Sequence, residues 1–277
     1  MPQPMANPCD LDVARLTSRL CRPPRSWTCV EVHERLASTN ALAMSRGRAW
    51  DVVVAEHQEA GRGRLDRSWV APAGTSLTFS ATVPAPVSAP GWVPLLAGLA
   101  VAEAVLAMTG LRAVLKWPND VLLPDDGHRK VCGVLCEYRP QRPGEEALVV
   151  VGIGLNVSQT RDELPVDTAT SLALAGADPI DREDLLVTVL DRFAIRYAAL
   201  LAGGSAADGV RAAYRGVCAT LRTHVHLERP GAAPASALAV DVDDDGALVV
   251  DDGSGPTRYA AGDVTHLRPA PGGGLLA

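Results

Sequence analysis

The sequence predicts an α+β protein with a second, smaller unit made of strands. Runs with helical spacing of apolar residues are interspersed with strand-like runs and hairpin turns, which is typical of an α+β or mixed α/β domain. After Gly203-Gly204 the pattern changes to short strands between turn residues, which indicates a small β-barrel. A chain of 277 residues with 47% hydrophobic residues is long enough to bury the core of one sizeable domain and a smaller one.

The elements of the larger domain follow from periodicity and from capping residues, glycine and proline. Helices are expected over residues 11–20, 41–46, 94–108 and 184–201, followed by a short helical stretch that ends at Val217. Asp181 should cap the helix over 184–201. Strands are expected at 28–32, 52–55, 75–83, 113–117, 131–138 and 147–157. The run 75–83 alternates polar and apolar residues, which indicates a half-buried strand.

The C-terminal unit contains two patterns that resemble metal sites. Four acidic residues and a glycine have the spacing of a calcium loop: Asp241, Asp243, Asp245, Gly246 and Asp252. Their flanks are strand-like, so we interpret them as an acidic hairpin turn, with further turns at Pro230-Gly231 and Asp252-Gly253. His224 and His226 would share one strand face, but no third ligand is apparent nearby, and we interpret both as surface residues.

Composition and charge exclude some classes of protein. A net charge of −6 argues against a protein whose main task is to hold nucleic acid. The most apolar stretch, 93–108, contains Glu103 and is expected to be too short to span a bilayer, and the N-terminus lacks the pattern of a signal peptide. The six cysteines form no Cys-x-x-Cys pair and are expected to be buried free thiols. We therefore expect a cytoplasmic protein without a membrane partner.

The stretch from Glu56 to Trp69 follows a strand-like run and is rich in glycine and arginine. Gly61 and Gly63 would let the backbone turn tightly and approach a ligand closely. The guanidinium groups of Arg62, Arg64 and Arg67 match carboxylates and phosphates, so the stretch suggests an anion clamp. Taken alone, it is equally consistent with a solvated surface loop, because no Walker-type lysine follows.

Lysine is rare in this chain, and its placement is informative. Of 26 basic residues only Lys116 and Lys130 are lysines, and both fall in one short window. Lys116 begins the sequence Lys-Trp-Pro-Asn-Asp, in which Asn119 could contact a phosphate or ribose and Asp120 could bind Mg²⁺. Lys130 begins a later strand, where Gly133 would permit a close approach of ligand.

Two further motifs add small polar groups and backbone amides. Ser38, Thr39 and Asn40 can cap the following helix, and the same groups can bind a small polar ligand. Gly152 and Gly154 would expose the amides of a strand that ends at Asn156. A dinucleotide fingerprint would need a third glycine that opens a helix, and this glycine is missing.

Together, and in this order, the motifs resemble those of the biotin protein ligase family. They are Ser-Thr-Asn (38–40), Gln-x-x-Gly-Arg-Gly-Arg-x-x-Arg-x-Trp (58–69), Lys-Trp-Pro-Asn-Asp (116–120), Lys-x-x-Gly-x-Leu-x-Glu (130–137) and Gly-x-Gly-x-Asn-Val (152–157). The resemblance implies a catalytic domain similar to class II aminoacyl-tRNA synthetases and a C-terminal SH3-like β-barrel. It implies formation of biotinyl-5′-AMP from biotin and ATP with Mg²⁺, then transfer of biotin to a lysine of a carboxyl carrier domain.

The resemblance also implies roles for individual residues. Those that would bind biotin are Ser38, Thr39, Asn40, Gln58, Gly61, Arg62, Arg64, Lys130, Gly133, Gly152 and Gly154. Those that would bind ATP are Arg64, Arg67, Trp69, Lys116, Asn119, Asp120 and Asn156, with Asp120 also a ligand of Mg²⁺. Lys130, Arg64 and Arg67 would be catalytic, because joining a carboxylate to a phosphate requires fixed cations near both anions.

The implied domains are an N-terminal extension packed on the catalytic domain (1–35), the catalytic domain (36–218) and the C-terminal barrel (219–277). Residues 1–35 are too few for the DNA-binding domain of some family members, so a form without that domain, and without a specific DNA partner, is expected. Two alternatives stay open: a lipoate or octanoate protein ligase, and a non-enzymatic module that binds a nucleotide or nucleic acid.

Overall fold

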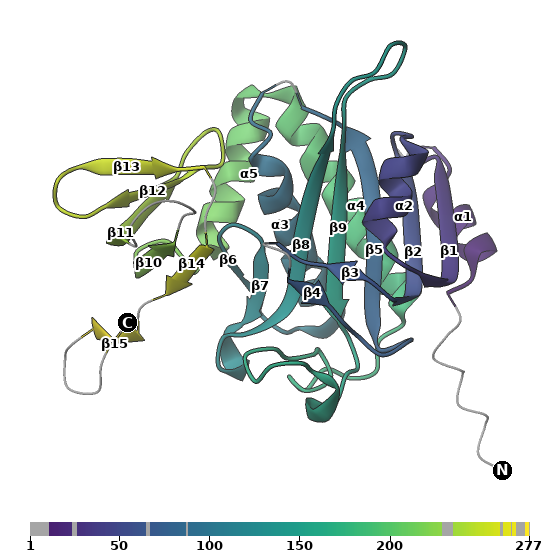
Figure 1. The fold of residues 1–277 in the computed structure, drawn as a ribbon, viewed down its shortest axis with the longest axis horizontal. Helices are drawn as coiled ribbons and strands as arrows, with labels where there is room; N and C mark the ends of the chain where they lie inside the picture. The colour runs from purple at the N-terminus through teal and green to yellow at the C-terminus, as the bar shows by residue number, and fades with distance from the viewer. Residues whose placement is uncertain are drawn as a thin grey trace.

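A seven-stranded mixed sheet forms the centre of the molecule, with helices on both faces and a smaller sheet at one end (Figure 1). The computed structural model describes residues 11–23, 27–64, 67–86, 88–228, 235–260, 263–266, 268–269 and 275–276. The helices are α1 (Val13–Leu20), α2 (Thr39–Arg46), α3 (Trp92–Thr109), α4 (Arg182–Ala202) and α5 (Gly204–Val217). All five lie where the sequence predicts helices, and Asp181 caps α4 through hydrogen bonds to the backbone N–H groups of Glu183 and Asp184.

The strands of the main sheet follow the spatial order β1-β2-β5-β9-β8-β7-β6. Their bounds are β1 (Cys29–Leu36), β2 (Asp51–Gln58), β5 (Ser76–Pro84), β9 (Leu148–Asn156), β8 (Arg129–Arg139), β7 (Asp120–Leu123) and β6 (Val114–Lys116). β1 and β2 are parallel and the other neighbours are antiparallel, which confirms the predicted α+β class. Since β1 is the edge strand of this sheet, residues 29–35 belong structurally with the sheet, and the extension over 1–35 stays a prediction.

Alternation along β2 assigns the helices to the two faces of the sheet. Val52 and Val54 lie in the main apolar cluster together with residues of α3 and α4, whereas Val53 packs with Ala43 of α2 in a second cluster. Successive side chains of a strand point to opposite faces, so α2 covers the face opposite to α3 and α4. The face that carries α2 is the one on which the predicted site residues lie.

The strand predicted at 75–83 is present as β5, but the prediction that it is half-buried was wrong. The polar residues of β5, from Ser76 to Thr82, are buried together with its apolar residues. Ser80 explains why, because its hydroxyl contacts Thr39 and Asn40 of α2. Polar alternation here marks a hydrogen-bonded interior face and not a solvated one.

The expectation that the most apolar stretch is too short to span a membrane was also wrong. α3 has 18 residues with a mean hydropathy of 1.8, and by length and composition it could cross a bilayer. In the structure 67% of this segment is buried, and α3 packs on α4 and on the main sheet. These contacts make α3 the central helix of the core.

The C-terminal unit is an antiparallel sheet with the order β13-β12-β11-β10-β14. Its strands are β10 (His224–Glu228), β11 (Ala235–Val242), β12 (Leu248–Asp251), β13 (Pro256–Tyr259) and β14 (Asp263–His266), followed by the short pair β15 (Arg268–Pro269) and β16 (Leu275–Leu276). The turns predicted at Asp245-Gly246 and Asp252-Gly253 join β11, β12 and β13, whereas Pro230-Gly231 lies outside the described residues. Closure into an SH3-like barrel and the likeness to class II synthetases stay predictions.

Candidate active site

The site residues gather along one row across the face of the sheet that carries α2. Asp120 of β7 pairs with Gly133 of β8, and Gly133 pairs with Gly154 of β9. Residues directly opposite in an antiparallel pair share a face, so these three positions form one line. A Cβ atom on Gly152 would overlap the amide of Asn40, which places Gly152 and α2 on this face as well.

The Gly/Arg stretch forms a hairpin that lies across this row. Its strands are β3 (Gly61–Arg62) and β4 (Ser68–Trp69), drawn in front of β8 and β9 in Figure 1. Residues 65–66 lie outside the described residues. Gly61 lies against the carbonyl of Trp69, so a side chain at 61 would overlap that backbone. Neither Gly61 nor Gly63 adopts a positive φ, so close packing, and not a left-handed turn, requires Gly61.

The indole of Trp69 occupies the space above two glycines of the sheet. A Cβ atom on Gly154 would overlap the indole, and one on Gly133 would lie 3.4 Å from its Cζ3 atom. The sequence predicts that Gly154 exposes backbone amides and that Gly133 permits a close approach of ligand. In the structure both glycines make room for the indole of Trp69 against the sheet.

Beside the hairpin, a chain of hydrogen bonds joins four polar side chains. Gln58 Oε1 accepts from the backbone N–H of Thr39 (2.7 Å) and from its hydroxyl (3.0 Å). The buried hydroxyl of Ser80 lies 2.8 Å from Thr39 Oγ1 and 2.6 Å from Asn40 Oδ1. Two hydroxyl protons serve this chain, so Thr39 can present either a donor or an acceptor to a ligand.

Glu137 connects this chain to the Gly/Arg hairpin. Its carboxylate accepts from Asn40 Nδ2 (2.7 Å) and, through both oxygens, from Arg62 Nη2 (3.0 and 3.1 Å). Asn40 donates its second amide hydrogen to the carbonyl of Leu135 (3.2 Å). Both amide hydrogens of Asn40 are therefore engaged within the protein, and its direct contact with biotin stays a prediction.

Ser80 and Glu137 were missed as site residues. Glu137 closes the motif 130–137, so its inclusion in that pattern is a signal that it has a role. Ser80 is a hydroxyl in the middle of an apolar strand, which is a weaker signal. Both become meaningful once Asn40 of α2 is seen to contact Ser80 of β5 and Glu137 of β8.

A second group of polar and charged side chains surrounds Asp120, at the β7 end of the row. Lys130 Nζ lies 2.6 Å from Asp120 Oδ1, and Arg64 Nη1 donates to Asn119 Oδ1 (3.1 Å). Asn119 Nδ2 in turn donates to the carbonyl of Val134 (3.0 Å), which ties the turn between β6 and β7 to β8. Lys116 faces Asp120 in the register of β6 and β7. The structure thus brings together both lysines, one arginine, one amide and one carboxylate.

Two of the predicted site residues, Ser38 and Asn156, form hydrogen bonds with the backbone near them. Ser38 is the N-cap of α2, and its hydroxyl accepts from the backbone N–H of Ala41. Asn156 is buried and donates to the carbonyl of Thr170 (2.8 Å) while accepting from Gln159 (3.0 Å). Asn156 therefore fixes the segment that follows β9. For Arg67, the structure places the backbone carbonyl 2.6 Å from the N–H of Gly63, which closes the hairpin.

A metal at this site would depend on few protein oxygens. Among the described residues no group of three His, Cys, Asp or Glu side chains could hold an ion. Asp120 is the carboxylate in the row, and Mg²⁺ is commonly held by one or two carboxylates together with substrate phosphates. This donor set fits a nucleotide-bound Mg²⁺ with Asp120 as its protein ligand.

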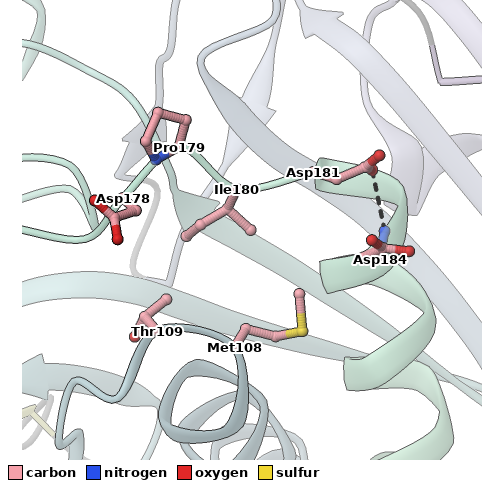
Figure 2. Close-up of a pocket in the computed structure, with 7 residues that line it drawn as sticks. All are labelled: Met108, Thr109, Asp178, Pro179, Ile180, Asp181 and Asp184. Atoms are coloured by element: carbon pink, nitrogen blue, oxygen red, sulfur yellow. Dashed lines mark hydrogen bonds between the residues drawn. The ribbon is translucent and has the colours of Figure 1, made fainter.

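A cavity of about 360 Å³ lies elsewhere, between the end of α3 and the start of α4 (Figure 2). It is lined by Met108, Thr109, Asp178, Pro179, Ile180, Asp181 and Asp184. Its carboxylates and the carbonyl end of α3 would repel a nucleotide or a carboxylate substrate. None of the predicted site residues lines this cavity. The row on the opposite face of the sheet carries lysine and arginine side chains, which suit anionic substrates better.

Comparison with known proteins assigns the chain to a family. The model of the biotin/lipoate A/B protein ligase family matches residues 32–156, and that of the biotin protein ligase C-terminal domain matches residues 223–267. A biotin–[acetyl-CoA-carboxylase] ligase of Mycobacterium tuberculosis is 35% identical over 269 residues, which are 93% of this chain and 96% of that protein. The chain belongs to the biotin protein ligase family. The resemblance seen in the motifs is thereby confirmed.

Other biotin protein ligases agree in length and fold. A biotin–[acetyl-CoA-carboxylase] ligase of Paracoccus denitrificans is 33% identical over 245 residues and is covered to 97%. The solved structure of the biotin protein ligase from Aquifex aeolicus in complex with biotin and ATP has a TM-score of 0.73 and 25% identity, and the match covers 87% of this chain and 100% of that one. The roles of the individual site residues stay predictions.

Proposed function

We infer that the chain is a biotin–[biotin carboxyl-carrier protein] ligase. It activates biotin with ATP to biotinyl-5′-AMP and transfers biotin to a lysine of a carboxyl carrier domain. The single observation that carries this inference is the 35% identity, along nearly the whole chain, to a biotin–[acetyl-CoA-carboxylase] ligase. The match of the C-terminal unit to the corresponding domain of biotin protein ligases favours biotin over lipoate or octanoate as the acid.

In the first step a carboxylate oxygen of biotin attacks the α-phosphorus of ATP, and pyrophosphate leaves. We assign Lys130 and Arg64 to the charge at the reacting centre, because both lie on the row next to Asn119 and Asp120. Lys130 would leave Asp120 for the two anions, and fixed cations stabilise the charge that develops between them. Mg²⁺ held by Asp120 and the phosphates would neutralise part of that charge.

We assign the opposite end of the row to the biotin ring system. Thr39 and Gln58 present hydroxyl and amide groups there, and Gly61 keeps the hairpin close enough to cover them. The Gly/Arg hairpin would exclude water from the mixed anhydride until the carrier lysine attacks its acyl carbon and AMP leaves. Arg67, Trp69 and Lys116 complete the nucleotide side of the proposal.

The proposal also covers partners and location. We propose a carboxyl carrier domain as the protein partner and no specific DNA partner, since the chain has a net charge of −6. We propose a cytoplasmic location, which accords with the free thiols of Cys21, Cys29, Cys132, Cys136 and Cys218. Burial raises the pKa of the Cys132 thiol far above its ordinary value, so this group is neutral.

The experiment that tests the function is biotin-dependent exchange of labelled pyrophosphate into ATP by the purified chain with Mg²⁺. We expect exchange with biotin and none with lipoate or octanoate. Lys130→Ala and Arg64→Ala should each lower the exchange rate by ~10² to 10³, by analogy with the loss of an oxyanion donor. Arg112→Ala removes an exposed arginine that pairs with Asp125 outside the site, and should leave the rate unchanged. Exchange with lipoate alone would transfer the chain to the sister enzymes.

A further inference from the structure

The turn between β11 and β12 lies against the main domain, at the tryptophan of the Lys-Trp-Pro-Asn-Asp motif. Trp117 Nε1 donates to the carbonyl of Gly246 (3.1 Å), and Trp92 Nε1 donates to the carbonyl of Asp243 (3.1 Å). Both indoles are buried, Trp117 to 1% and Trp92 to 0% exposure. A Cβ atom on Gly91 would overlap the carbonyl of Asp245, so the turn is packed without a gap on the first turn of α3.

The acidic residues of this turn fix its shape. Asp243 Oδ1 accepts from the backbone N–H groups of Asp245 (2.9 Å) and Ala247 (3.0 Å). Arg258 bridges the carboxylates of Asp243 and Asp245. Gly246 has a φ of +87°, which is the left-handed region that favours glycine. The pattern that resembles a calcium loop is therefore a rigid turn, whose carbonyls are aimed at two indoles.

The segment that leads into the C-terminal sheet holds Trp117 from a second side. The backbone N–H of Trp117 donates to Thr220 Oγ1 (2.9 Å), and the backbone N–H of Ala219 donates to the carbonyl of Leu115 (2.8 Å). Lys116 precedes Trp117, and Asn119 and Asp120 follow after Pro118, whose peptide bond to Trp117 is cis. The C-terminal unit thus holds the residue around which three proposed nucleotide ligands are arranged.

We propose that the Asp243–Gly246 turn and Thr220 act as positioning residues for the nucleotide half of the site, through Trp117. This inference rests on the proposed function for the identity of the ligand as ATP. The turn sets the position of the Trp117 ring, the ring sets the turn between β6 and β7, and that turn carries Asn119 to Arg64 and Asp120 to Lys130. The biotin half is built on α2, β2 and β5 and does not depend on this contact.

The matched pair of variants Trp117→Phe and Trp92→Phe tests the proposal. Each variant removes one buried indole N–H that donates to a carbonyl of the Asp243–Gly246 turn. Only Trp117 lies in the turn between β6 and β7, which carries Asn119 and Asp120. Displacement of site groups by about 1 Å can cost up to ~10²-fold, so we expect the KM for ATP to rise on the order of tenfold in Trp117→Phe. It should change less than about twofold in Trp92→Phe, and the KM for biotin should change less than about twofold in both.

Thr220→Val provides a second variant of nearly unchanged shape. It removes the hydroxyl that accepts from the backbone N–H of Trp117, and it leaves the indoles of Trp117 and Trp92 in place. We expect the same selective rise in the KM for ATP, with a smaller loss of thermal stability than in Trp117→Phe. An equal effect of Trp92→Phe on the KM for ATP would overturn the proposal, as would equal rises in the KM for ATP and biotin, or wild-type values in Trp117→Phe and Thr220→Val.

Calorimetric titration with ATP separates this inference from the proposed function. It measures nucleotide binding without any reaction. Selective weakening of ATP binding in Trp117→Phe and Thr220→Val would support the positioning role even if the wild-type chain fails to exchange pyrophosphate. Unchanged ATP binding in both variants would sink the positioning role even if wild-type exchange with biotin is normal.

Discussion

The proposed biotin pocket depends on the side-chain amide of Asn40 more than on any other single group among the described residues. It bridges the hydroxyl of Ser80, the carbonyl of Leu135 and the carboxylate of Glu137, and it is 4% exposed. Removing one partner of a buried hydrogen bond leaves the other without compensation. Loss of this amide would leave three buried or half-buried groups to find new partners, beside the residues proposed to bind biotin.

We therefore expect Asn40→Ala to lower the free energy of unfolding by about 1–3 kcal/mol. It should also raise the KM for biotin, because Ser80, which contacts Thr39, loses its bond to the amide of Asn40, while the KM for ATP stays close to wild type. Urea denaturation and pyrophosphate exchange measure the two effects. Ser45→Ala, on the exposed side of the same helix, is the control. Wild-type stability in Asn40→Ala would refute the bridging role.

At this scale the motifs indicate which residues lie near one another but not how they contact one another. Thr39 and Gln58 meet in the structure, as do Lys130 and Asp120, and their roles stay predictions. The bridge from Asn40 to Glu137 joins residues that are 97 positions apart, and no local pattern encodes such a contact. The glycines at 152 and 154 were predicted as site positions for a different physical reason from the one observed.

At the scale of elements, helix α4 is joined to the strand that leads into the site. Arg182, in its first turn, donates to both oxygens of Glu56 (2.6 and 3.1 Å) near the end of β2. The side chains are 10% and 3% exposed, and Glu56 also accepts from the N–H of Leu11 before α1. This pair connects α1, α4 and β2 two residues before Gln58.

Glu56→Gln should lower the free energy of unfolding by about 3–5 kcal/mol, because it removes the carboxylate charge that faces the buried guanidinium of Arg182. Chemical denaturation monitored by circular dichroism measures this loss. Glu59→Gln removes a carboxylate of the exposed pair with Arg35 on the same strand end, and should be close to neutral. Equal stability of the two variants would show that burial of the Glu56–Arg182 pair is unimportant.

Long elements were predictable, and three short strands were not. The helices and most sheet strands have their own periodicity and caps, so their positions follow from local sequence. β3, β4 and β7 have two, two and four residues, and they exist because a partner strand pairs with them. β5 was predicted as a strand, but its exposure was misjudged. Alternation of polar and apolar residues does not show whether the polar face meets water or a helix that forms hydrogen bonds with it.

At the scale of the whole molecule, the two sheets share one apolar core. Val225 and Leu248 of the C-terminal sheet lie in the same cluster as Trp92, Trp117 and the residues of α3. The indole contacts of Trp92 and Trp117 join positions 151 and 129 residues apart, so the sequence predicts two units but not their union. A shared core and buried hydrogen bonds predict that the two units unfold together.

The turn that joins the units makes this stability depend on pH. Burial alone would raise the pKa of Asp243, but hydrogen bonds from Arg258 and from the backbone N–H groups of Ala247 and Asp245 outweigh it and lower the pKa. A lowered pKa in the folded state stabilises the fold at pH values above the ordinary carboxyl pKa near 3.8. This contribution is lost as the pH falls through the folded value.

We accordingly expect Asp243→Asn to melt about 2–4 °C below the wild type at pH 7, which corresponds to roughly 1 kcal/mol in a chain of this size. The difference should shrink as the pH falls below 3.8 and through the lowered pKa of the folded protein, where the wild-type carboxylate becomes protonated and can no longer attract Arg258. Thermal melts at several pH values measure the gap. Asp244→Asn, whose side chain is 83% exposed in the same turn, is the control. A gap that persists unchanged into acid would mean that the charge of Asp243 does not stabilise the turn, and that the hydrogen bonds from the backbone N–H groups of Asp245 and Ala247 account for the difference.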